Sequence, residues 1–228
     1  MDAIIDTAWA VGSAAAALSG AGCRTVIRYY NHRNSSRLPS KRLERAEAEA
    51  LSAAGLSLAV VFQQRGGAGG HLSDLDATAG ARDGARALDC AARVGQPEGS
   101  AIYFAVDHDF LARERAEIRL YFAALRRVLA NRYRLGVYGS GALGAELLEC
   151  ELADYVWLAG ARGWSGTRQM LAEGGWALFQ SALHLNWNGI SYDANIVGAS
   201  GEFGAFTPLG CAPATSPLPP IRPTMSAR

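Results

Sequence analysis

Several features that would assign a protein class are missing from this sequence of 228 residues. The formal net charge is +1, and no basic stripe or acidic block stands out, so nothing indicates a nucleic-acid or membrane-surface partner. No apolar run approaches the roughly 18 residues that a membrane-spanning helix requires. The four cysteines form no C-x-x-C pair and no histidine completes a zinc spacing, so we expect neither a metal site nor a disulfide framework.

The N-terminus also lacks the positively charged segment of an ordinary secretory signal peptide. We therefore expect a soluble monomer that is made in the cytoplasm. Any export to the cell wall is expected to use a non-classical route that leaves no N-terminal mark.

Proline is concentrated near the C-terminus. Six of the eight prolines lie in residues 207–228, where they break regular structure. We expect this segment to be a flexible tail. Half of all residues are hydrophobic, and the preceding 206 residues are enough for one α/β barrel domain.

Short apolar segments alternate with helical patterns along residues 1–206. The clearest helical pattern lies in residues 113–133, where apolar residues recur at helical spacing: Ile118, Phe122, Leu125 and Leu129. We expect strands at 3–6, 24–30, 56–63, 101–107, 135–138, 155–158, 176–180 and 191–196. We expect helices at 13–21, 40–54, 75–94, 113–133, 140–149 and 167–173.

This alternation predicts a parallel sheet that is covered by helices. Eight such units close most naturally into a single-domain (β/α)8 TIM-type barrel of the α/β class. An open doubly wound sheet is the alternative topology. Residues 181–190, between the last two strands, show no helical pattern, and we interpret them as a loop.

Polar or aromatic residues end nearly every predicted strand, and in parallel α/β folds these ends form the active site. Four of them are carboxylates that we expect around one mouth: Asp6, Asp107, Asp109 and Asp193. The others are candidates for contact with a substrate: Arg28, Tyr30, Gln63, Tyr138, Trp157, Gln180 and Asn195. The aromatic members have flat faces that suit the CH faces of sugar rings.

Asp107 and Asp109 are two residues apart, so on a strand their side chains point to the same side. The pair has room for either the retaining or the inverting spacing of glycosidases, and that choice stays open. Two carboxylates this close are expected to raise one pKa, as a general acid requires. The alternative is that Asp109 caps the loop or helix that follows.

Two glycine-rich segments resemble nucleotide-binding motifs but lack the partner residues of those motifs. Residues 139–144 match G-x-G-x-x-G, yet the next strand has no acidic residue to bind a ribose. Residues 66–70 lack the Gly-Lys-Ser/Thr ending of a P-loop, and we interpret them as a flexible loop over the mouth. We therefore expect no cofactor.

Several segments, taken in order, resemble a bacterial family of glycoside-hydrolase-like domains of unknown function. The resemblance covers residues 1–206 and rests on Ile5-Asp6, residues 26–30, 51–56, 95–97, 102–107 and 136–140, and Asp193. That family is distantly related to the family-25 lysozymes, which are peptidoglycan muramidases with a barrel fold. By position, Asp6, Asp107 and Asp193 match acidic strand-end residues of the lysozymes. The lysozymes carry Asp-x-Glu on strand four with the Glu as general acid, whereas Asp109 here is one methylene shorter.

The resemblance implies a glycoside hydrolase that acts on the peptidoglycan of the bacterial cell wall. In this hypothesis Asp109 donates the proton, Asp107 stabilises positive charge or assists water, and Asp6 and Asp193 position the substrate. Two alternatives use the same barrel. One is a glycan-binding module without catalysis, and the other is a secreted antibacterial or lysis effector with the same chemistry.

Overall fold

The computed structural model describes residues 1–63 and 71–211. The glycine-rich segment 66–70, and the predicted tail beyond residue 211, lie outside the described residues.

Eight strands form a closed barrel in the order of the sequence. They are β1 (Ile4–Asp6), β2 (Thr25–Tyr30), β3 (Ser57–Phe62), β4 (Ala101–Ala105), β5 (Arg134–Gly139), β6 (Tyr155–Leu158), β7 (Leu178–Trp187) and β8 (Ile190–Val197). Strands β1 to β7 pair in parallel, and β8 runs antiparallel to both β7 and β1. The predicted α/β barrel of TIM type is confirmed, with one strand reversed.

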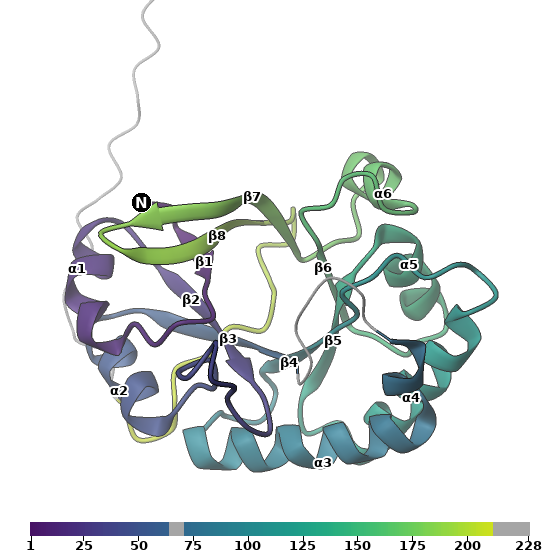
Figure 1. Ribbon diagram of the computed structural model, residues 1–228, viewed down its shortest axis with the longest axis horizontal. Helices are drawn as coiled ribbons and strands as arrows, with labels where there is room; N and C mark the ends of the chain where they lie inside the picture. Colours follow the sequence, from purple (N-terminus) through teal and green to yellow (C-terminus); the bar gives the residue numbers. More distant parts are fainter. Residues whose placement is uncertain (64–70, 212–228) are drawn as a thin grey trace, which may run out of the picture.

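Six α-helices of the described chain follow strands β1 to β6 and surround the sheet (Figure 1). They are α1 (Ala15–Gly20), α2 (Arg45–Ala53), α3 (Ala77–Val94), α4 (Arg115–Leu129), α5 (Gly141–Glu149) and α6 (Thr167–Glu173), with 3-10 turns η1 (Gly12–Ala14) and η2 (Leu72–Asp74). The long helix α3 lies on the opposite side of the molecule from the β7–β8 hairpin. None of the helices in the described ranges is both long enough and apolar enough to cross a membrane.

The connection between the last two strands differs from the prediction. The loop predicted at 181–190 is wrong, because β7 continues to Trp187 and turns directly into β8 at Asn188-Gly189. Both turn residues have positive φ, 51° and 86°, which is the backbone of the tight turns that Asn-Gly favours in hairpins. A hairpin needs no crossover helix, and its two strands must be antiparallel.

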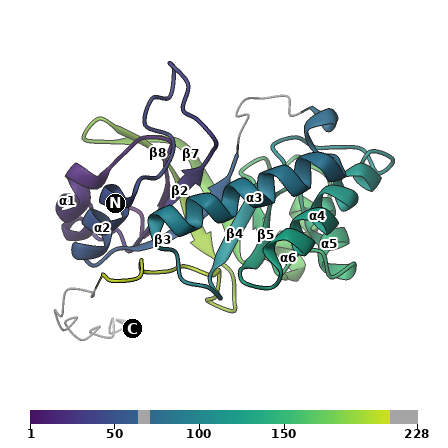
Figure 2. The same cartoon turned by 90° about the horizontal axis from the view of Figure 1, so that it is seen from below.

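Two apolar layers stabilise the barrel. One fills its interior with alternate strand residues, among them Ile27, Val61, Tyr103, Trp157 and Leu178. The other packs the outer face of the sheet against the helices. Helices α3 and α4 approach closely, because a Cβ added at Gly80 would lie 2.3 Å from the carbonyl oxygen of Tyr121. Figure 2 shows these two helices side by side.

The segment after β8 returns beneath the barrel and covers the N-terminal ends of its strands. Leu58 and Phe206 exchange two backbone hydrogen bonds, and the Ala101 amide donates to the Gly204 carbonyl. The Tyr103 hydroxyl, inside the barrel, donates to the Phe203 carbonyl at 2.9 Å. This segment leaves uncovered the opposite end of the barrel, where β1 and β4 end.

The G-x-G-x-x-G segment has a packing role. Ser140 caps helix α5 by accepting a hydrogen bond from the Leu143 amide. A Cβ at Gly141 would lie 2.3 Å from the Gly166 carbonyl oxygen, and one at Gly144 would lie 2.6 Å from Val156. Close approach of helix α5 to its neighbours thus explains the glycines at 141 and 144.

Candidate active site

Two carboxylates lie opposite each other where β1 meets β8. Asp6 ends β1, and its Cα partner on the antiparallel strand is Asp193. The Gln180 amide, from β7, donates to Asp6 at 3.0 Å and to Asp193 at 3.4 Å. Asn195 donates a further hydrogen bond to Asp6 at 2.8 Å. Reversal of β8 brings Asp193 to this end of the barrel although it lies in the middle of its strand.

Asp6 is a buried acid that favours its protonated form. Burial raises its pKa to about 7, and the nearby charge of Asp193 acts in the same direction. Hydrogen bonds from Asn195, Gln180 and the Tyr29 hydroxyl oppose this effect. Near pH 7 about half of the Asp6 carboxyls are therefore protonated.

A third carboxylate, Asp107, lies two residues beyond the end of β4. It is half-buried, and Gln63 donates to its Oδ2 at 3.3 Å. Burial raises the pKa of Asp107, while the Gln63 hydrogen bond and the nearby Lys41 and His108 lower it. This combination describes an acid held against the barrel interior with one face toward solvent.

Tyr138 on β5 connects the three acids. Its hydroxyl donates to the Gln180 side-chain oxygen at 2.9 Å. Burial raises the pKa of Tyr138, and the charges of Asp107, Asp6 and Asp193 raise it further. A single hydroxyl that feels the charge of all three carboxylates indicates that they lie at the same end of the barrel.

Asp109 has a different position. Its Oδ2 accepts hydrogen bonds from the amide and the hydroxyl of Ser165, both at 2.9 Å. The other oxygen, Oδ1, is buried and has no hydrogen-bond partner in the described chain. Asp109 thus joins the loop after β4 to the loop before α6, 56 residues further along the chain, rather than capping the helix that follows it.

Two predicted substrate contacts, Arg28 and Tyr30, are not brought to the mouth. On β2 the inward residues are Ile27 and Tyr29, so Arg28 and Tyr30 point outward. Both are fully buried between the sheet and the helices. Arg28 pairs with Glu47 of α2 at 2.8 Å, and the Tyr30 hydroxyl donates to Gln96 at 2.9 Å.

The remaining predicted contacts form the wall and floor of the mouth. Trp157 is only 1% exposed, and its indole donates to Asn195 at 2.9 Å, so both residues lie below the surface that a ligand reaches. Its ring packs edge-on against Tyr138, with the ring centroids 4.9 Å apart. Gln63 and Tyr138 are half-buried and reach the opening.

Two residues at the mouth were missed from the sequence, Tyr29 and Lys41. Tyr29 shares the inward parity of Ile27, a signal that strand alternation contains. Lys41 lies in the irregular segment between β2 and α2, where no periodicity applies. Its ammonium donates to the Gln63 side chain at 2.9 Å and lies 4.6 Å from the centre of the Tyr29 ring.

A cavity of about 410 Å³ adjoins Asp107 and Gln63. Its wall combines apolar side chains with charged ones, including Phe62, Tyr121, Arg33, Arg82 and Asp83. Within the described ranges, no cluster of three or more His, Cys, Asp or Glu residues has the geometry to hold a metal ion. Asp107 and Gln63 line this cavity, whereas Asp6, Asp193 and Tyr138 do not.

Comparison with known proteins agrees with this architecture. The model of the Rv2525c-like, glycoside hydrolase-like domain matches residues 16–190. YbfG of Bacillus subtilis (strain 168) is 31% identical over 196 residues, which cover 80% of this chain and 25% of YbfG. FadG of the same strain is 28% identical over 129 residues, covering 54% of this chain and 22% of FadG. The chain thus spans about a quarter of the length of these relatives.

Solved structures share the fold. The Mycobacterium tuberculosis Tat-secreted protein Rv2525c, in complex with L-tartrate, superposes with a TM-score of 0.76 at 22% identity, covering 89% of this chain and 97% of Rv2525c. The modular autolysin LytC of Streptococcus pneumoniae superposes with a TM-score of 0.53 at 12% identity, covering 84% of this chain and 45% of LytC. Since the family model spans most of the barrel, this chain belongs to the Rv2525c-like, glycoside hydrolase-like domain family.

Proposed function

We propose that this domain hydrolyses the glycan strands of bacterial peptidoglycan, as a muramidase does. The observation that carries the proposal is the convergence of Asp6, Asp107 and Asp193 on one open end of the barrel, around Tyr138. Carboxylates gathered in this way are the groups that glycosidases use, and they need no metal. Support also comes from the fold of LytC, an autolysin whose structure has been solved with a synthetic peptidoglycan ligand.

Asp107 is the proposed proton donor to the leaving glycosidic oxygen. Burial favours its protonated form, which a general acid requires. The Gln63 amide occupies Oδ2, so the proton is placed on Oδ1. We assign this role to Asp107 rather than to Asp109, because the Oδ2 of Asp109 accepts two hydrogen bonds from Ser165.

The Asp6–Asp193 pair is proposed to stabilise the positive charge that develops on the sugar as the bond breaks. The pair carries negative charge at the mouth, while Gln180 and Asn195 hold its carboxylates in place. Attack on the sugar carbon then comes from water or from the acetamido group of the substrate. Tyr138 and Tyr29 border the same space and are the proposed sugar contacts.

Digestion of purified peptidoglycan tests the proposal, with released muropeptides measured by mass spectrometry and by clearing in a zymogram. We expect wild-type protein to release reducing-end sugars, and Asp107→Asn to lose about a hundredfold or more in rate. Asp109→Asn is the matched control two residues away, and we expect it to retain most of the activity. Release of products by Asp107→Asn at the wild-type rate, or none by folded wild-type protein at any pH, would refute hydrolysis.

A second candidate function is glycan binding without cleavage. It is favoured by the position of Asp109, which corresponds to the general acid of the lysozymes but forms loop contacts here. This candidate predicts that insoluble peptidoglycan retains the protein in a pull-down and releases no product. Retention should then be the same for wild type and Asp109→Asn.

Peptidoglycan lies outside the cytoplasm, so either function also requires export. Cell fractionation of the native host, with detection of the protein in the wall fraction, tests this part of the proposal. Strictly cytoplasmic protein would contradict it.

A further inference from the structure

Lys41 is the single lysine of the chain. The other 21 of its 22 basic residues are arginine, yet the residue at this position is lysine and is 6% exposed. Lysine is almost never buried unless it is paired, because the ammonium loses its hydration. The two cations also differ in kind, since arginine is planar and stays charged, whereas lysine presents a compact ammonium that can lose its proton.

The Lys41 ammonium lies at the mouth between Tyr29 and Gln63. It donates to the side-chain oxygen of Gln63 at 2.9 Å and to the Gln63 carbonyl at 3.2 Å. Burial lowers the pKa of Lys41 to about 8; the negative charge of Asp107 opposes this effect, and the positive charge of Arg28 adds to it. Lys41 is thus a buried cation whose charge is favoured by the proposed proton donor, Asp107.

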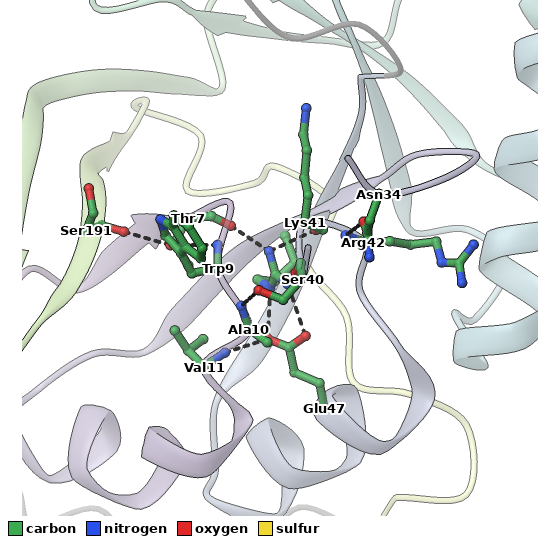
Figure 3. Close-up of polar contacts among 11 residues, drawn as sticks. Thr7, Trp9, Ala10, Val11, Asn34, Ser40, Lys41, Arg42, Glu47 and Ser191 are labelled. Carbon is green, nitrogen blue, oxygen red and sulfur yellow. Dashed lines mark hydrogen bonds and ion pairs between the residues drawn. The ribbon is translucent and has the colours of Figure 1, made fainter. Parts of the chain in front are cut away.

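The backbone of Lys41 is held from below by a buried ion pair. The Arg28 guanidinium donates to the Lys41 carbonyl at 3.1 Å and to the Ser40 carbonyl at 2.7 Å, while it pairs with Glu47. Figure 3 shows Ser40 and Glu47 beside this segment, with the Lys41 side chain extending away from Glu47. These two contacts hold the Lys41 backbone in place, and from that position the side chain extends to Gln63.

The contact between Lys41 and Gln63 determines which way the Gln63 amide faces. A lysine ammonium can only donate hydrogen bonds. The Gln63 atom that faces it must therefore be the side-chain oxygen, which accepts the bond. The amide nitrogen must then point the other way, where it donates to Asp107 Oδ2 at 3.3 Å. With the amide reversed, the ammonium would face an NH2 group and Asp107 would lose its donor.

We propose that Lys41 is a positioning residue for Asp107: it orients the Gln63 amide so that Oδ2 of Asp107 accepts a hydrogen bond and Oδ1 remains to carry the proton. Lys41 acts through Gln63 and has no contact with the reacting atoms in this scheme. The catalytic consequence rests on the proposed function. The coupling between Lys41 and Asp107 is a property of the folded protein alone.

Other titratable groups surround Lys41 and Asp107. Asp107 and Arg28 act on Lys41, and Lys41 and His108 act on Asp107. Tyr138 interacts with Asp107, Asp6 and Asp193, and Tyr29 interacts with Asp6 and Asp193. Of these groups, Lys41 has its pKa near 8, so its hydrogen bond to the Gln63 amide weakens as the pH rises through that value and the positive charge is lost.

Nuclear magnetic resonance tests the coupling without any substrate. Protein labelled with [ε-¹³C]lysine gives one lysine side-chain resonance, because Lys41 is the only lysine. Titration of that resonance measures its pKa directly. We expect Asp107→Asn to lower the pKa of Lys41, because the favourable negative charge is gone. Asp109→Asn, whose carboxylate contacts Ser165, is the matched control and should leave the titration of Lys41 unchanged.

The reciprocal experiment follows the Asp107 carboxyl carbon in Lys41→Met, where we expect the pKa of Asp107 to rise. In the pH profile of peptidoglycan release, the same variant should shift the basic limb to higher pH, and Lys41→Arg should restore it toward wild type. An unchanged lysine titration in Asp107→Asn overturns the inference, even if Lys41→Met fails to fold. If the titrations are coupled but the wild type releases no product, the proposed hydrolysis fails and the positioning role stands.

Discussion

Replacement of Arg28 by methionine measures what the buried ion pair beneath the mouth contributes to stability. Arg28 is fully buried, and its guanidinium makes five hydrogen bonds, two to Glu47 and three to the backbone carbonyls of Thr7, Ser40 and Lys41. Methionine is apolar and restores none of them. Glu47, 7% exposed, would keep only its contact with the Val11 amide at 2.8 Å.

The expected loss is large because a charge would remain buried without its partner. Removal of one member of a buried ion pair costs about 3–5 kcal/mol. Each carbonyl left without a donor adds about 1–3 kcal/mol where water cannot replace it. The Ser40 carbonyl is only partly buried, so water can replace its lost hydrogen bond and these contributions do not simply add. We expect Arg28→Met to lower the free energy of unfolding by at least about 3 kcal/mol.

Urea unfolding followed by tryptophan fluorescence measures this loss, since the chain has five tryptophans. Arg132→Met is the matched control, because Arg132 pairs with Glu98 at the surface with side chains 49% and 59% exposed. We expect no resolvable change in the control. The double variant Arg28→Met/Glu47→Leu should be more stable than Arg28→Met alone, because no charge is then buried. A loss below about 1 kcal/mol in Arg28→Met, the scale of a surface pair, would refute this reasoning.

Three further predictions concern the mouth, the barrel interior and a helix end. Burial raises the pKa of Asp6 from 3.8 to about 7, so between these values the folded state binds a proton that the unfolded state does not. The free energy of unfolding therefore falls as the pH rises from about 4 to 7 and then levels off. Asp6→Asn should flatten the matching fall in melting temperature, and an unchanged slope would contradict this prediction. Gly136→Ala places a Cβ 2.3 Å from the Tyr103 ring and should cost about 1–3 kcal/mol in urea unfolding, whereas no loss would mean that the interior has spare room. Asp76 caps helix α3 through the Ala79 amide at 2.7 Å, so Asp76→Ala should cost about 1 kcal/mol and Asp76→Ser much less; equal losses would argue against a capping role.

Much of the fold was predictable because it depends on local pattern. Helix α4 (Arg115–Leu129) lies inside the predicted range 113–133, since the apolar spacing of Ile118, Phe122 and Leu125 has only one way to be buried. The hairpin was not predicted although Asn188-Gly189 is a strong turn signal, because the preceding βα repeats favour a crossover connection at this place. The reversed strand also explains why Asp193 and Asp6 became direct neighbours.

Some predicted site residues face the mouth and others do not, and the difference depends on side-chain parity along each strand and on contacts with loops. Asp6 and Gln180 lie on strands and face the barrel interior, where strand ends were expected to converge. Arg28 and Tyr30 lie one residue out of phase with Tyr29, so they face the helices, and their polarity did not reveal this. Lys41 follows no repeating pattern, because the irregular segment between β2 and α2 positions it through Arg28.

The sequence by itself determined the order of most elements and the presence of acids at the predicted strand ends, because both can be read along the chain. Only the tertiary structure decided that the sheet closes into a barrel rather than staying open. Only the tertiary structure decided which acids share the mouth and which one contacts a loop. It also placed the single lysine beside Gln63 and Asp107. The physical reason is that these contacts join residues far apart in sequence, and their distances follow from strand register and buried ion pairs that local patterns do not encode.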